Sequence, residues 1–180
     1  MTAQEMETRV RRLEDRLEIA GIQARYTIFI DDHDLARVAP LFARNGRFRS
    51  ADGVMDAIGR EAICAQYKER FKALRFGFHT TQDHVIDLDD ADPDRAVGIV
   101  SSHAEVVRNG RAMVVGMRYY DEYVREGGAW RIADRNLHFF YYVPVDEYAA
   151  ALSTRERQRA YGDRRPAELP ETRQTYAAAD

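Results

Sequence analysis

This sequence of 180 residues is first notable for what it has little of. Its single cysteine, Cys64, excludes an internal disulfide and any zinc or iron–sulfur site built from several cysteines. Long apolar runs are missing too, because the longest ones, such as T-I-F-I and H-F-F-Y-Y-V-P-V, are too short to cross a bilayer. No segment of the sequence is repeated along the chain.

An excess of charge of one sign is also absent. Lys and Arg number 27 against 30 Asp and Glu, which gives a net charge of -3 at pH 7. This balance gives no reason to expect nucleic acid or an anionic membrane as a partner. The first fifteen residues are charged throughout and contain no apolar signal-peptide core, so we expect a cytoplasmic protein.

What the sequence does have is enough apolar content for one domain with a core, since 45% of its residues are hydrophobic. Helical periodicity comes first along the chain and predicts helices over residues 5–30, 34–44 and 60–74. The first of these has an apolar stripe at helical spacing, consisting of Leu13, Leu17, Ala20, Ala24 and Ile28.

From residue 76 the hydrophobic period changes to two, which indicates strands. Asn-Gly at 109–110 and Gly-Gly at 127–128 are tight-turn signals that predict an antiparallel meander. Helices followed by such a meander predict an α+β fold with a curved sheet around the helices. A short strand is expected from residue 45, and residues 53–59 are expected to form a loop. A last helix over 146–161 and an extended or disordered arm to residue 180 complete the prediction.

The stretch Y-T-I-F-I-D-D-H-D, residues 26–34, joins the first two predicted helices. Asp34 precedes an amphipathic segment and is expected to be its N-cap, while Asp32 and His33 have the character of a solvated turn. Asp31 lies at a helix C-terminus, where unpaired carbonyl groups and the helix dipole disfavour an anion. It is therefore either an accident of the surface or a functional group.

The predicted strands contain histidines, and the alternation of side chains along a strand assigns each of them to one of the two faces of the sheet. It places His79 on one face of the strand 78–88 with Thr81 and Asp83, and His84 on the other face. On the next strand, His103 shares a face with Ile99 and Ser101. A histidine in mid-strand is more often structural than catalytic. His79, His103 and Asp31 would also make a two-histidine, one-carboxylate metal set, although their spacing matches no recognised ligand motif.

Several segments together resemble one family, and they recur in a characteristic order. After Y-T-I-F-I-D-D-H-D come L-F-A-R-N-G-R-F, G-R-E-A-I, F-H-T-T-Q-D-H-V-I-D and A-W-R-I-A-D-R. This order resembles the SnoaL-like polyketide cyclase group of the nuclear-transport-factor-2-like superfamily. That superfamily also contains scytalone dehydratase, bile-acid 7-alpha dehydratase, hexachlorocyclohexane dehydrochlorinase and ketosteroid isomerase. The resemblance implies a cone-shaped α+β barrel over residues 1–145, with a strongly bent, mixed or antiparallel sheet around three N-terminal helices and a C-terminal helix and arm over 146–180.

The resemblance also implies an Asp–His dyad, which the dehydratase and dehydrochlorinase members carry. The aspartate follows a tyrosine of the first helix by five residues, which here corresponds to Asp31 after Tyr26. The histidine begins the first long strand, which here corresponds to His79. Asp83 stands where members usually have Asn. The resemblance implies His103 and Arg135 as further residues of the substrate pocket. Phe29 and Tyr119 are expected to bind substrate as well, because aromatic side chains suit a flat hydrophobic molecule.

We therefore expect a small-molecule lyase or isomerase that needs neither metal nor organic cofactor. Asp31 and His79 would form the general base and Tyr26 would donate a hydrogen bond, acting on a hydrophobic ring substrate in an enclosed pocket. The alternative is a ligand-binding or structural subunit similar to the beta subunits of aromatic-ring dioxygenases, which share this fold.

A bent sheet of this kind leaves an apolar outer face, which we expect at Ile86, Leu88, Val106 and Val114. Covering that face predicts a homodimer or homotrimer, with the arm of residues 146–180 lying across a neighbour or over the pocket.

Overall fold

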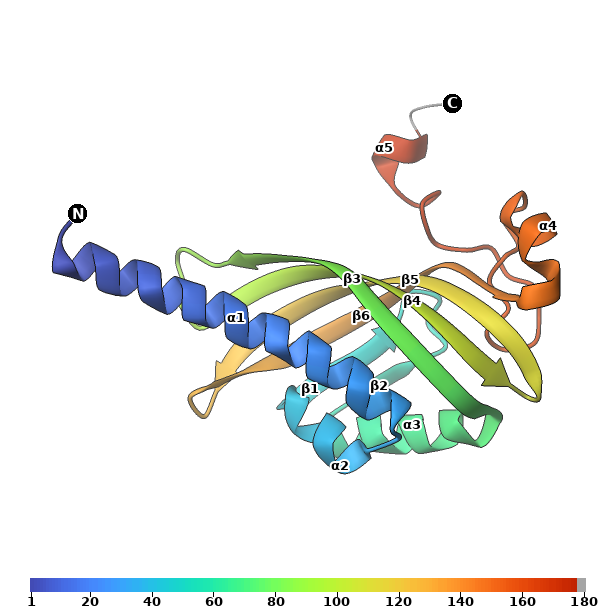
Figure 1. Ribbon diagram of the computed structural model, residues 1–180, viewed down its shortest axis with the longest axis horizontal. Coiled ribbons are helices and arrows are strands. Elements are labelled where there is room, and N and C mark those ends of the chain that lie inside the picture. Colours follow the sequence, from blue (N-terminus) through green and yellow to red (C-terminus); the bar gives the residue numbers. More distant parts are fainter. Residues whose placement is uncertain (178–180) are drawn as a thin grey trace.

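The computed structural model describes residues 1–177 and has the predicted α+β architecture (Figure 1). Six strands form one curved sheet in the order β2-β1-β6-β5-β4-β3, which remains open because β2 and β3 are free edges. The strands are β1 (Phe42–Ser50), β2 (Asp56–Ile58), β3 (Leu74–Leu88), β4 (Arg95–Arg108), β5 (Arg111–Glu126) and β6 (Ala129–Pro144). The helices are α1 (Ala3–Asp31), α2 (Leu35–Val38), α3 (Arg60–Ala73), α4 (Tyr148–Leu152) and α5 (Gln174–Ala177), and 3-10 turns cover Ala39–Leu41 and Val145–Glu147.

The meander predicted for the second half of the chain is confirmed. Strands β3 to β6 pair antiparallel with their sequence neighbours, and β1 adds to β6 in parallel, which makes the sheet mixed. The hairpin turns contain Asn109 and Gly110 at φ 50° and 78°, and Gly127 and Gly128 at φ 64° and 80°. These left-handed conformations match the right-handed twist of the strands they join.

Helix α1 begins with a capping box between Thr2 and Glu5 and ends at Asp31. Its first turns project beyond the sheet (Figure 1), so the outward side of the helix remains uncovered. The stripe noted in the sequence lies on this outward side: Leu13 is 61% exposed and Leu17 is 74% exposed. The buried side is formed instead by Ile19, Ile22, Tyr26, Phe29 and Ile30. No described helix combines the length and apolar character needed to cross a membrane.

Two predicted helices are shorter than expected. The helix expected over 34–44 ends at Val38, because Pro40 cannot donate the backbone bond that a longer helix requires, and β1 already begins at Phe42. The segment expected as a loop supplies the short strand β2. The helix expected over 146–161 is reduced to a 3-10 turn and the five residues of α4.

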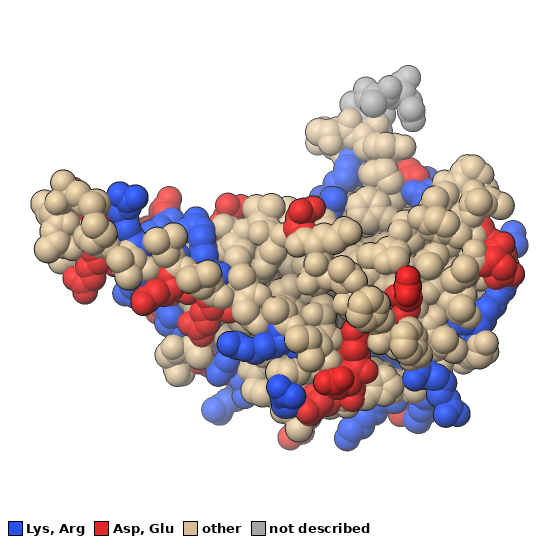
Figure 2. All heavy atoms as spheres, viewed as in Figure 1, with Lys and Arg blue, Asp and Glu red and all other residues tan. Residues whose placement is uncertain are grey.

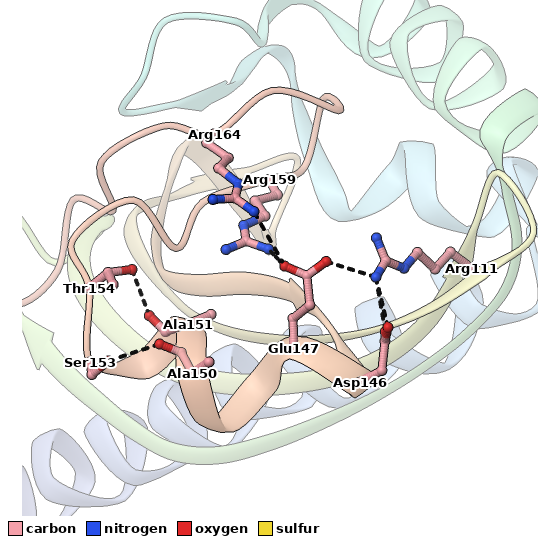
Figure 3. Close-up of polar contacts among 9 residues, drawn as sticks. All are labelled: Arg111, Asp146, Glu147, Ala150, Ala151, Ser153, Thr154, Arg159 and Arg164. Atoms are coloured by element: carbon pink, nitrogen blue, oxygen red, sulfur yellow. Dashed lines mark hydrogen bonds and ion pairs between the residues drawn. The ribbon is translucent and has the colours of Figure 1, made fainter.

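The arm is ordered as far as the structure describes it and packs on its own sheet. The arm pairs with the part of the β6 edge that extends beyond the end of β1. The Leu169 amide donates to the Phe139 carbonyl at 3.0 Å, and the Tyr142 amide donates to the Arg157 carbonyl at 2.8 Å. Figure 3 shows how ion pairs hold its beginning. Glu147 accepts from Arg111 and Arg159 and pairs with Arg164, and Asp146 pairs with Arg111.

The inward-facing residues differ from the prediction on the first two strands of the meander, β3 and β4. On β4 the even-numbered residues face the core, so Val106 is buried. On β3 a bulge between Thr81 and His84 reverses the phase, so His79 and Thr81 face inward and then Ile86 and Leu88 do so as well. The expected outer face was therefore wrong for Ile86, Leu88 and Val106.

The apolar residues that the outer face does expose lie on β3 and β4, and Figure 2 shows few charged side chains over the middle of the molecule, where these strands run in Figure 1. These residues are more than one-third exposed, and they are Phe76, Phe78, Val85, Val97 and Ile99.

Candidate active site

Asp31 and His79 meet where the end of α1 reaches the first half of β3. The Oδ1 atom of Asp31 lies 2.5 Å from Nδ1 of His79, and the His79 backbone amide donates to Oδ2 at 2.8 Å. The two side chains are only 18% and 16% exposed. The predicted geometric pairing is thus present. Because a carboxylate only accepts, Nδ1 is the protonated nitrogen in the neutral form of this imidazole, which leaves a free lone pair on Nε2.

Local backbone structure explains why a carboxylate is tolerated at this helix end. The last turn of α1 has no basic residue, but β3 is an edge strand, so the His79 amide is free to donate to Asp31. Gly77 lets the two elements come close, since a Cβ atom there would stand 3.3 Å from Oδ1 of Asp31. Asp32 and His33 are exposed and Asp34 caps α2 by accepting from the Arg37 amide at 3.1 Å, as predicted.

Tyr26 lies one and a half turns before Asp31 and is buried. Its hydroxyl shares a short hydrogen bond with the hydroxyl of Tyr67 on α3. Behind it, the guanidinium of Arg135 stands 4.2 Å from the ring centre of Tyr26 and 4.5 Å from that of Tyr119. Burial raises the pKa of Tyr67 and of Tyr119 well above the ordinary value, so these hydroxyls remain protonated and able to donate.

A cavity of about 60 Å³ lies between the helices and the sheet. Its wall is mostly apolar, with side chains from α1, α3 and all the long strands. His79, Tyr26, Tyr67 and Tyr119 supply polar groups to this wall, and Arg70 supplies a cation. A largely buried imidazole that shares a cavity wall with tyrosine hydroxyls is suited to moving protons on a bound small molecule.

The other predicted site residues have different outcomes. Tyr119 forms part of the cavity wall, whereas Phe29 is buried outside it, under the guanidinium of Arg37. Arg135 is fully buried in a two-pronged ion pair with Asp121, so it supports the tyrosines and does not line the cavity. Direct substrate contact by Phe29 and Arg135 is therefore not supported by this geometry.

His103 does not reach the cavity. It sits on the outer face of β4, because the inward-facing residues there are even-numbered, and its ring packs edge-on against Tyr141. Its predicted place in the pocket was wrong. For the same reason the alternative metal set of Asp31, His79 and His103 is not assembled, and residues 1–177 contain no other group of three candidate ligands.

Reasoning from the sequence did not assign Tyr67 and Arg70 to the site. Tyr67 lies on the buried stripe of α3 with Ile63, and the signal was a polar hydroxyl on an otherwise apolar stripe. Arg70 follows one turn later on the same helix and also lies in the cavity wall. A cation at that position of a buried stripe is the pattern that could have identified it.

Comparison with known proteins identifies relatives by sequence and by fold. The SnoaL-like domain family matches residues 11–136. No functionally curated protein matches the sequence significantly.

Similar solved structures cover most of this chain. Hexachlorocyclohexane dehydrochlorinase LinA-type3 from Novosphingobium barchaimii has a TM-score of 0.69 at 18% identity, covering 76% of this chain and 93% of its own. A putative scytalone dehydratase from Novosphingobium aromaticivorans has a TM-score of 0.66 at 18% identity, covering 74% and 89%. A protein from that organism described as NTF2-like with a cystatin-like fold has a TM-score of 0.63 at 22% identity, covering 77% and 90%.

Proposed function

Because this chain belongs to the SnoaL-like family, we propose that it is a small-molecule lyase or isomerase whose general base is the Asp31–His79 dyad. The reaction is a dehydratase-type elimination or a double-bond shift on a hydrophobic ring substrate. The single observation that carries this proposal is the 2.5 Å contact between Asp31 and His79 in the wall of a cavity. The fold similarity to a dehydrochlorinase and a putative scytalone dehydratase supports the same class of reaction.

In the proposed reaction the free Nε2 of His79 takes a proton from a carbon atom of the substrate. Asp31 stabilises the imidazolium that forms, since its carboxylate accepts from Nδ1. The electron pair of the broken C–H bond forms a double bond as a hydroxyl group leaves the neighbouring carbon, and the imidazolium returns its proton to that hydroxyl as water. In a double-bond shift the same proton returns to a different carbon.

Tyr26 and Tyr67 stabilise negative charge as it develops on oxygen. Their hydroxyls are hydrogen-bonded to each other, so one can donate onward to a substrate oxygen while the other supports it. Arg135 behind Tyr26 adds positive potential without contacting the substrate. All these groups come from the chain itself, and the proposal uses no metal or organic cofactor.

The size of the cavity sets a condition on the substrate. A dry cavity of about 150 Å³ is known to hold benzene, and the cavity here measures about 60 Å³. A ring substrate therefore requires the wall to move outward. Tyr161 of the arm packs against the core, so we propose that the arm shifts when substrate enters.

We also propose that the protein forms a homodimer or homotrimer through the outer face of β3 and β4. Phe76 and Phe78 are 53% and 55% exposed there, and Val85 and Ile99 face each other across the two strands. Neighbouring apolar side chains of this size are usually covered by another subunit.

Proton abstraction can be tested without knowing the natural substrate. A panel of cyclic ketones and cyclic β-hydroxyketones is incubated in D₂O, and loss of the α-proton signal and formation of enone are followed by NMR. The variants Asp31→Asn and His79→Ala should each lower exchange by at least about 100-fold, the usual contribution of a general base. The double variant should be little worse than either, because the two residues act as a unit.

Asp32→Asn is the matched control, because Asp32 is the exposed neighbour of Asp31 and should keep the wild-type rate. Full activity in Asp31→Asn would refute the dyad. Binding of ring compounds without any exchange would favour the ligand-binding alternative.

A further inference from the structure

Two arginines in and beside the cavity wall make no ion pair with the described carboxylates. Arg70 lies in the cavity wall, and the hydrogen bond that its guanidinium makes is to the Sδ atom of Met55 at 2.7 Å. A thioether is a weak acceptor. No carboxylate of residues 1–177 lies within ion-pair distance of Arg70. A half-buried guanidinium in such surroundings loses hydration without gaining a partner.

Arg108 is the second such cation. It continues the inward-facing row of β4 after Ala104 and Val106, both of which line the cavity. Its Nη1 atom is buried and has no hydrogen-bond partner in the described part of the chain. Nearby arginines differ in this respect: Arg111 and Arg159 are neutralised by Asp146 and Glu147, as Figure 3 shows.

Two tyrosine hydroxyls share this region, and neither has a well-formed hydrogen bond to the described residues, although guanidinium groups lie close to both. They belong to Tyr142, whose ring lines the cavity, and to Tyr161 of the arm. Burial raises the pKa of Tyr142, while the charges of Arg108 and Arg70 oppose that rise, so both cations lie near its hydroxyl. Burial likewise raises the pKa of Tyr161, opposed by Arg70 and reinforced by the nearby carboxylate of Asp52, which is itself bound to Ser50 and Gln158. Arg70 and the ring of Tyr142 thus line the cavity, and Arg108 and Tyr161 lie next to these two residues, just outside its wall.

We propose that this arginine cluster, defined as Arg70, Arg108, Tyr142 and Tyr161, binds a carboxylate group of the ligand. The ligand is then a hydrophobic ring acid, and it is the substrate if the proposed function holds. Guanidinium groups hold planar carboxylates with paired, charge-assisted hydrogen bonds, and tyrosine hydroxyls can donate to the same oxygens. The rest of the wall is mostly apolar and suits the ring, with His79 in the same cavity.

Binding of matched small probes tests the proposal by calorimetry on the full chain. Benzoate is compared with benzamide, which has nearly the same shape but no charge, and with inorganic phosphate. Benzoate should bind at least about tenfold more tightly than benzamide, since a hydrogen bond to a charged group contributes at least about the free energy of a tenfold change. Arg70→Met and Arg108→Met should each remove most of this preference and leave benzamide binding unchanged.

Arg75→Met is the matched control, because Arg75 is exposed and lies outside the cavity wall. It should bind benzoate as the wild type does. Equal affinity for benzoate and benzamide, no benzoate binding, or tighter binding of phosphate than of benzoate would each overturn the proposal. A loss of thermal stability in Arg70→Met with the acid preference intact would also overturn it, because the arginine would then only support the arm.

The outcome is separable from that of the proposed reaction. Asp31→Asn should still prefer benzoate over benzamide, because Asp31 is not part of the arginine cluster. A wild-type protein that binds benzoate but shows no proton exchange would refute the lyase proposal alone. Proton exchange without any preference for acids would refute the arginine cluster alone.

Discussion

The ion pair between Arg135 and Asp121 offers a quantitative test of the packing behind the candidate site. Both side chains are 0% exposed. Arg135 donates to the two carboxylate oxygens at 2.9 and 2.6 Å and to Oε1 of Gln23 at 2.5 Å. Arg135→Met keeps the aliphatic stem but leaves Asp121 with only the Tyr123 hydroxyl, at 2.7 Å, as a side-chain donor. Removing one partner of a buried ion pair typically costs about 3–5 kcal/mol.

The single tryptophan makes this cost measurable. Trp130 is fully buried and its indole nitrogen donates to Asp15 at 3.0 Å, so its fluorescence reports global unfolding. Urea unfolding at fixed protein concentration should give a free energy of unfolding lower by about 3–5 kcal/mol for Arg135→Met. The control is Arg47→Met, which breaks an exposed pair with Asp56 of similar geometry and should have a far smaller effect.

A double variant separates the buried charge from the lost packing. Arg135→Met combined with Asp121→Asn removes the uncompensated carboxylate and should recover about 2 kcal/mol relative to Arg135→Met alone. If Arg135→Met costs less than about 1 kcal/mol, as exposed pairs do, then the pair is not desolvated and the reasoning fails. The same result would remove the claim that Arg135 supports Tyr26 and Tyr119 from within the core.

The remaining predictions concern assembly and pH. Light scattering at micromolar concentration should give the mass of a dimer or trimer, and Phe78→Glu should give a monomer; a monomeric wild type would contradict the proposed interface. Burial lowers the pKa of His84 below its ordinary 6.5, an effect opposed by Asp121 and reinforced by Arg135. The unfolded chain therefore binds a proton at higher pH than the folded chain, and the free energy of unfolding should fall as pH drops below about 6.5. His84→Gln should flatten this dependence in urea titrations, and an unchanged slope would show that His84 does not contribute.

The sequence allowed prediction of those features that depend on local chemistry. Helical spacing, the Asn109–Gly110 turn and the capping role of Asp34 each require only neighbouring residues, and the structure confirms them. The approach of Asp31 to His79 joins residues 48 positions apart. It was predicted through resemblance to a family and not through any local rule.

What could not be predicted depends on where elements stop and which side they bury. The apolar stripe of α1 containing Leu13 and Leu17 fits a core face equally well, but the helix packs its other face, with Ile19 and Ile22, against the sheet. His103 was misplaced because the resemblance indicates only its strand, and alternation gives two faces of that strand without saying which is inward. The arm has no periodicity, yet the free edge of β6 provides backbone partners for it.

The bulge between Thr81 and His84 also bears on how this protein can change over evolutionary time. It divides β3 into one half that places His79 at the cavity and another that places Ile86 and Leu88 in the core. Point substitutions at Gln82 or Asp83, which are exposed, leave both halves in phase. Loss of a single codon there would remove the extra residue and restore regular alternation with both halves facing as they do now, whereas loss of two codons would turn one half inside out. Descendants of this chain should therefore tolerate the loss of one residue at this point of the strand and not the loss of two.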